Sequence, residues 1–165
     1  MSIEIVDVKA QPMIYLTIRT VMAPARIASE LKLSLAQLAT FMADNGIVAM
    51  GAPHAIYGDW GDRFITLEVG IPVSEADAAK ASGRVMRGST PAGPALKATH
   101  CGSRTRVPEV YARMNEHVQR ESLRTTGLTW EVHPEPLPQD DDASIDIYMQ
   151  LAPPAPNERR VQSSV

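Results

Sequence analysis

The sequence contains two related stretches, Gly51-Ala-Pro-His-Ala-Ile-Tyr57 and Gly127-Leu-Thr-Trp-Glu-Val-His133. Each is followed, after a polar interval, by a second apolar stretch, Arg63-Phe-Ile-Thr-Leu-Glu-Val-Gly-Ile-Pro-Val73 in the first half and Ser144-Ile-Asp-Ile-Tyr-Met-Gln-Leu151 in the second. In the aligned copies Ala55 corresponds to Glu131, Tyr57 to His133 and Glu68 to Asp146. A duplicated scaffold with one asymmetric acid, Glu131, predicts a pocket where the two halves meet.

Hydrophobic periodicity around these stretches predicts the same order of elements twice. In the first half we expect strands at 2–9 and 12–20, a helix over 24–45 that ends at Gly46, and strands near 52–58 and 63–73. In the second half we expect a strand at 95–100, a helix over 106–125 that ends at Gly127, and strands at 128–134 and 144–151. The Gly- and Pro-rich residues 78–94 are interpreted as the link, with a short strand at 84–87.

These elements form a βαββ unit that occurs twice. We therefore predict an α+β fold, a duplicated βαββ repeat with an antiparallel sheet, two helices on one face and a ligand groove on the other. A pseudo-twofold axis would place the first strands of the two units side by side at the centre. We expect residues 1–153 to form a single domain, with repeat one at about 10–73, a linker at about 78–94 and repeat two at about 95–153. Residues 154–165 are poor in apolar side chains and are expected to be a flexible tail.

The overall composition argues against several classes of protein. A net charge of -3 and a pI near 5.8, with no basic stripe, argue against direct nucleic-acid binding. No apolar run reaches the roughly 18 residues of a membrane span, so no membrane association is expected. The start Met1-Ser-Ile-Glu lacks the order of a signal peptide, and a single cysteine, Cys101, fits a reducing compartment. We therefore expect a cytoplasmic protein.

Neither a metal nor a cofactor is indicated. The four histidines, His54, His100, His117 and His133, show no paired metal-ligand spacing, and Asp140-Asp-Asp142 lacks a calcium-loop pattern. We therefore assign no metal ligands and no cofactor.

Several motifs resemble those of GyrI-like small-molecule-binding domains, which include the effector-binding domains of BmrR-type multidrug regulators. The resemblance rests on Gly127 to Leu151, with its Gly-x-x-x-Glu start, on Ala98-Thr-His-Cys-Gly102, on Gly51 to Tyr57 and on Leu67-Glu-Val-Gly-Ile-Pro-Val73. It covers residues 10–153. The family contains effector-binding domains, stand-alone proteins that bind or sequester small molecules, a gyrase-inhibiting protein and hydrolases of cyclopropane-bearing toxins.

The resemblance implies a role for Glu131, which matches the family's buried, ligand-facing glutamate. Two positions depart from the family pattern. His133 stands where a tyrosine is common, and Gly102 is followed by Ser-Arg-Thr rather than an aromatic residue. These departures predict a different pocket lining and hence a different ligand. The sequence shows no helix-turn-helix pattern, so a DNA-reading module is not expected within it.

Strand alternation assigns the candidate residues to faces. Glu131 and His133 share one face of their strand. If the aliphatic residues of the stretch 144–151 cover the helices, then Asp146 and Tyr148 join Glu131 in the groove, and Glu68 joins them by the same reasoning. The alternative interpretation, an ordinary solvated carboxylate, fits Glu68 and Asp146 at least as well.

The aromatic residues have structural alternatives of their own. Trp130 is interpreted as core under the second helix, and Tyr111 and Met114 as core on its apolar stripe. Trp60 lies in a polar turn, where a lid over the groove and an exposed surface position are equally compatible with the pattern.

The favoured hypothesis is binding of an amphipathic, cationic or basic aromatic small molecule. Glu131 would supply the charge, with Tyr57, Tyr148, Trp60 and His133 as walls. One alternative is a hydrolase of strained electrophiles such as cyclopropanoids, with Glu131 and a hydroxyl of Tyr57 or Tyr148 as catalytic groups. Another is a protein-interaction role, such as topoisomerase inhibition, through the acidic loop 135–142.

Overall fold

The computed structural model describes residues 2–133 and 143–153. The first half contains β1 (Ile3–Val8), β2 (Pro12–Val21), α1 (Pro24–Asn45), β3 (His54–Trp60) and β4 (Phe64–Pro72). A short helix α2 (Glu75–Ala78) and the strand β5 (Met86–Ser89) follow, and the second half contains β6 (Gly93–Gly102), a 3-10 turn (Arg104–Arg106), α3 (Val107–Arg120), β7 (Thr125–Val132) and β8 (Ala143–Leu151). The predicted order βαββ, repeated, is confirmed. The acidic loop 135–142 and the tail 154–165 lie outside the described residues.

The ends of the two long helices differ from each other. α1 begins at Pro24 and ends before Gly46, whose φ of 64° is left-handed, as the sequence predicts. α3 ends at Arg120, so the prediction that Gly127 ends this helix is wrong. Gly127 lies inside β7 with a φ of 90°, where the pairing with β8 shifts between Thr125 and Thr129. The β-branched residues at the start of β7 favour a strand over another helical turn.

The strands form one sheet in the order β1-β6-β8-β7-β3-β4-β2-β5. The two halves therefore meet at β3 and β7, and the prediction that their first strands meet at the centre is wrong. The reason is that β2 already pairs with β4 and β5, and β6 with β8 and β1, so neither has an edge left for the other, whereas β3 and β7 pair with each other. In the central pair Ala55 lies opposite Glu131. The one asymmetric acid of the duplication, Glu131, thus lies at the junction of the halves.

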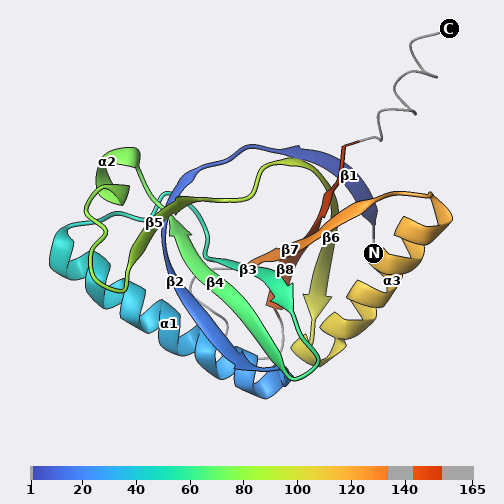
Figure 1. The fold of residues 1–165 in the computed structure, drawn as a ribbon, viewed down its shortest axis with the longest axis horizontal. Helices are drawn as coiled ribbons and strands as arrows, with labels where there is room; N and C mark the ends of the chain where they lie inside the picture. Colours follow the sequence, from blue (N-terminus) through green and yellow to red (C-terminus); the bar gives the residue numbers. More distant parts are fainter. Residues whose placement is uncertain (1, 134–142, 154–165) are drawn as a thin grey trace, which may run out of the picture.

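The helix-free face of the sheet is covered by a two-stranded ribbon. β1 continues into β2, and β5 continues into β6. The two segments are joined where the Gln11 N–H donates to the Thr90 hydroxyl and the Thr90 N–H donates to the Gln11 carbonyl, each at 2.8 Å. The ribbon crosses over the central strands (Figure 1). Beneath it lies a small core of Met13, Ile56, Ala95 and Trp130. We call this side the ribbon face.

Both long helices lie on the opposite face, which we call the helix face, as predicted (Figure 1). α1 packs through Leu31 and Leu38 on β2, β3 and β4, and α3 packs through Val110 and Met114 on β6 and β8. The two helices have separate hydrophobic cores rather than one shared core, so they do not close over the middle of the sheet. No helix among the described residues is long and apolar enough to cross a membrane.

Candidate functional site

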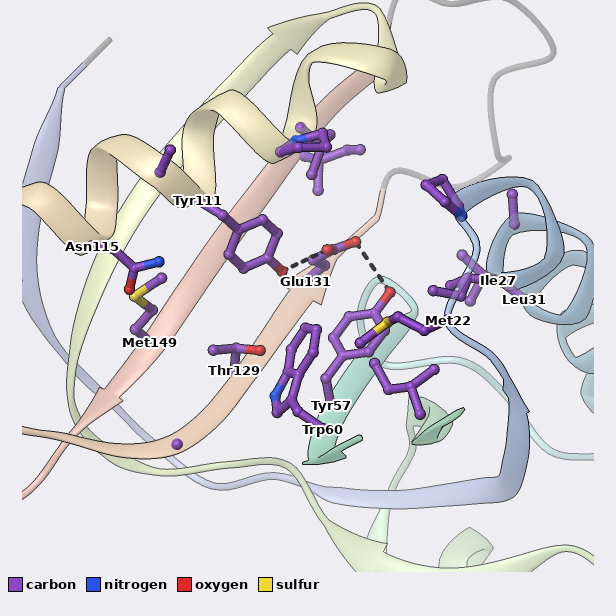
Figure 2. Close-up of a pocket in the computed structure, with 18 of the residues that line it drawn as sticks. Met22, Ile27, Leu31, Tyr57, Trp60, Tyr111, Asn115, Thr129, Glu131 and Met149 are labelled. Atoms are coloured by element: carbon purple, nitrogen blue, oxygen red, sulfur yellow. Dashed lines mark hydrogen bonds between the residues drawn. The ribbon is translucent and has the colours of Figure 1, made fainter. Parts of the chain in front are cut away.

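A cavity of about 760 Å³ opens between the two helices, above the central strands. The N-terminal halves of α1 and α3 form its sides, and β3 and β7 form its floor (Figure 2). The lining residues are Met22, Pro24, Ile27, Ala28, Leu31, Tyr57, Trp60, Ile65, Val107, Pro108, Tyr111, Ala112, Asn115, Thr125, Gly127, Thr129, Glu131, His133, Ile145 and Met149. Most of them are apolar or aromatic, which is usual for a small-molecule site.

The cavity lies on the helix face, so the prediction of a groove on the opposite face is wrong. Two observations explain the difference. The β7–β8 register places Glu131 beside Ile147, which belongs to the core under α3. The other face is filled by the core beneath the ribbon, where Trp130 is 1% exposed. Trp130 is therefore a core residue, as expected, but the prediction that it packs under the second helix is wrong.

Glu131 is the centre of the cavity floor and is 8% exposed. Tyr111 donates a hydrogen bond of 2.7 Å to its Oε2, and Tyr57 donates a longer one of 3.5 Å to its Oε1 (Figure 2). Burial, with the charge of Glu131 second, raises the pKa of Tyr111 well above its usual value. Both phenols are therefore donors that hold the carboxylate in place. No lysine, arginine or second acid occurs among the described lining residues.

Two further polar side chains flank Glu131, that of Thr129 within β7 and that of His133 just beyond the end of this strand. His133 is 3% exposed, and its Nε2 lies 3.1 Å from Oε1 of Glu131 without hydrogen-bond geometry. The Thr129 hydroxyl is buried and lies near enough to Tyr111 to lower the pKa of that phenol, again without a hydrogen bond of ordinary geometry. Strand alternation places both side chains on the same face as Glu131.

The rim of the cavity is aromatic. The ring centroids of Tyr57 and Trp60 lie 5.4 Å apart at 36°, and Trp60 is 46% exposed. Trp60 ends β3 rather than occupying a free turn, and it lines the opening. An exposed indole beside a phenol gives a flat ligand a surface on which to stack.

Sequence reasoning missed Tyr111, which it treats as core. The side chain is only partly buried, and its hydroxyl reaches Glu131 across the cavity. A signal was present, because Val107, Tyr111 and Asn115 recur at a spacing of four and lie beside the Val110–Met114 stripe on α3. A phenol on such a face needs a partner for its hydroxyl, and Glu131 was the candidate acid.

Three predicted site residues lie on the ribbon face instead, because each stands opposite a ribbon-face residue in the neighbouring strand. Tyr148 pairs with Trp130 and stacks on it at 4.9 Å and 4°, with Nζ of Lys97 5.8 Å from its ring. Asp146 accepts a 2.7 Å hydrogen bond from Thr99. Glu68 pairs with Ile56, and burial raises its pKa. They do not share the cavity with Glu131.

The described residues contain no cluster of three or more His, Cys, Asp or Glu side chains that could hold a metal ion. The carboxylate, the phenols and the imidazole of the cavity can instead form hydrogen bonds and pair with a cation.

Solved structures share this fold. The chain is 16% identical to the crystallised C-terminal domain of EcmrR, with a TM-score of 0.78 over 92% of this chain and 97% of that one. It is 8% identical to SAV2435 bound to tetraphenylphosphonium, with a TM-score of 0.62 over 92% and 94% of the two chains. It is 14% identical to a hydrolase encoded by lin2189 of Listeria innocua, with a TM-score of 0.60 over 91% of each chain.

At these identities the likeness shows a common fold. The chain spans 57% of the length of EcmrR in its DNA complex. No family model matches the sequence, and no curated protein matches it.

Proposed function

We propose that the chain is a GyrI-like domain whose interhelix cavity binds an amphipathic organic cation, for sensing or sequestration. The observation that carries the proposal is Glu131, the single acid among the described residues that line an otherwise mostly apolar cavity. A cation that leaves water for this cavity regains much of its lost solvation through a charge-assisted contact with the carboxylate. The rings of Tyr57, Trp60 and Tyr111 add attraction between the cation and aromatic faces.

The fold comparisons support this proposal. SAV2435 shares the fold and has been solved with tetraphenylphosphonium, a lipophilic cation. A cavity of about 760 Å³ has room for an organic ligand of drug-like size.

The test compares a cation with its neutral analogue. The probes are biphenylmethyl-dimethylamine, which is protonated at neutral pH, and the hydrocarbon in which a CH group replaces the nitrogen. Glu131→Gln removes the charge and keeps the shape, so it is expected to weaken binding of the cation by about 2 kcal/mol or more and binding of the hydrocarbon much less. Titration calorimetry or fluorescence measures both affinities.

Glu68→Gln is the matched control, because it makes the same change on the ribbon face, in β4 of the same sheet. It is expected to leave both affinities unchanged. Equal losses for cation and hydrocarbon in Glu131→Gln would remove Glu131 from charge recognition.

Hydrolysis is the second candidate, favoured by the two phenols that hold Glu131 at the floor of the cavity. Glu131 would take a proton from water as the water oxygen attacks a strained ring carbon, and would return that proton to the carbon released when the ring bond breaks. Tyr57 and Tyr111 are the hydroxyls in place for this role, whereas Tyr148 lies on the other face. Wild type should then consume a cyclopropane-bearing electrophile at least about a hundredfold faster than Glu131→Gln. Stoichiometric binding without product would exclude turnover of that compound.

A further inference from the structure

Three buried polar atoms on the cavity floor lack a hydrogen-bond partner. They are the Thr129 hydroxyl and both ring nitrogens of His133, of which Nε2 lies 3.1 Å from Oε1 of Glu131 without hydrogen-bond geometry. The residues that the structure describes contain no other buried side-chain nitrogen or oxygen without such a bond. Buried polar groups in proteins are almost always paired, so such atoms need an explanation. All three belong to residues that line the same cavity, on either side of Glu131.

These atoms form a polar row along one side of the cavity. Thr129, Glu131 and His133 follow the alternation of β7, and same-face residues of a strand stand about 6.6 Å apart. The wall formed by α1 is apolar and includes Ile27 and Leu31 (Figure 2). A ligand that matches this arrangement has an apolar body and a polar edge with hydrogen-bonding groups next to its charge.

We propose that the cavity selects protonated amines that carry N–H groups over fully substituted onium ions. This proposal rests on the function proposed above and refines its ligand class. An ammonium N–H donates to Glu131, to the Thr129 oxygen or to the unprotonated nitrogen of His133. A quaternary ion has the same charge but no donor, so it pairs with none of these atoms and places a methyl group where the N–H would lie. The tetraphenylphosphonium ion bound by SAV2435 likewise has no N–H group, so this chain is expected to differ from that protein in selectivity.

The experiment compares two cations with the same apolar body and the same charge. They are biphenylmethyl-dimethylamine, protonated at pH 7.5, and the biphenylmethyl-trimethylammonium ion, with tetraphenylphosphonium as a third probe. Wild type is expected to bind the tertiary amine about tenfold more tightly than the trimethylammonium ion, a difference that corresponds to about 1.4 kcal/mol. Equal affinity, or tighter binding of either fully substituted ion, would overturn the proposal.

Two variants identify the atoms responsible. Thr129→Val and His133→Phe keep approximate shape and remove the unpaired atoms, so the variant that lacks the atom paired with the single N–H is expected to reduce the preference to less than about threefold. Thr17→Val, the same change at an exposed position of β2, is expected to keep it. Thermal unfolding of each variant shows whether it folds, and the wild-type comparison decides the proposal if one does not.

The remaining outcomes separate the two proposals. If wild type prefers the amine but both variants keep the full preference, these atoms are not its cause and the inference fails while the function stands. If neither cation binds more tightly than the neutral hydrocarbon, the proposed function fails and the inference fails with it.

Discussion

The helix face and the ribbon face of the central sheet present the same kinds of side chain but use them differently. Each face has a glutamate, a tyrosine and a tryptophan, namely Glu131, Tyr57 and Trp60 on the helix face and Glu68, Tyr148 and Trp130 on the ribbon face. On the ribbon face the protein itself supplies the partners, since Tyr148 stacks on Trp130 and Asp146 bonds to Thr99. On the helix face the Thr129 hydroxyl and the His133 ring nitrogens form no hydrogen bond within the protein. Residue type alone therefore does not identify the binding site. The two faces differ because the ribbon covers one of them, whereas α1 and α3 leave the other open.

The largest expected effect compares the two tryptophans. Trp130→Ala removes a ring that is 1% exposed and should lower the free energy of unfolding by about 3 to 5 kcal/mol. Trp60→Ala removes a ring that is 46% exposed at the cavity rim, so it should lower stability far less and weaken aromatic ligands instead. Urea unfolding of both variants measures the difference. Similar losses of stability in the two variants would show that Trp60 is packed as tightly as Trp130, which contradicts an open cavity rim.

An intermediate effect compares two tyrosines. Tyr111→Phe deletes the 2.7 Å hydrogen bond to the buried carboxylate of Glu131 and should cost about 1 to 3 kcal/mol of stability. Tyr148→Phe on the ribbon face keeps the ring that stacks on Trp130 and should change stability by less than about 0.5 kcal/mol. Chemical denaturation at pH 7.5 provides both values. A larger loss in Tyr148→Phe than in Tyr111→Phe would reverse their assigned roles.

The smallest effect tests whether the ribbon face excludes water. Burial lowers the pKa of His54, opposed by its bond to the Ala52 carbonyl, and burial raises the pKa of Glu68. The His54 contribution to stability is therefore present above its unfolded pKa of about 6.5 and is lost as pH falls through the folded value. The Glu68 contribution has the opposite sign, because it is present below the unfolded pKa of about 4.3 and is lost as pH rises through the folded value.

Urea unfolding between pH 7.5 and 5.5 should accordingly show a smaller loss of stability in His54→Gln than in wild type. Glu68→Gln should reduce the fall in the free energy of unfolding that Glu68 causes as pH rises above about 4.3. Unchanged slopes in both variants would mean that these side chains remain solvated.

Much of the fold could be predicted because it depends on local patterns. The 3.6-residue period of α1, its stop at Gly46 and the alternation of the strands are all properties of neighbouring residues. Where a pattern was ambiguous, the prediction was wrong, as for the end of α3, where Gly127 belongs to a bulge in β7. The short helix α2 gave no periodic signal and was not predicted.

The sequence by itself determined that the order of elements is duplicated, that Glu131 has no counterpart in the first half, and that Glu131 and His133 share one face. Only the tertiary structure decided which face that is. Alternation assigns side chains relative to one another within a strand, but the register between β7 and β8 determines that Glu131 lies beside Ile147 and under the helices. The gap between α1 and α3, the ribbon that fills the other face and the reach of Tyr111 to Glu131 all depend on contacts between segments far apart in the chain. Local sequence patterns contain no information on such distances.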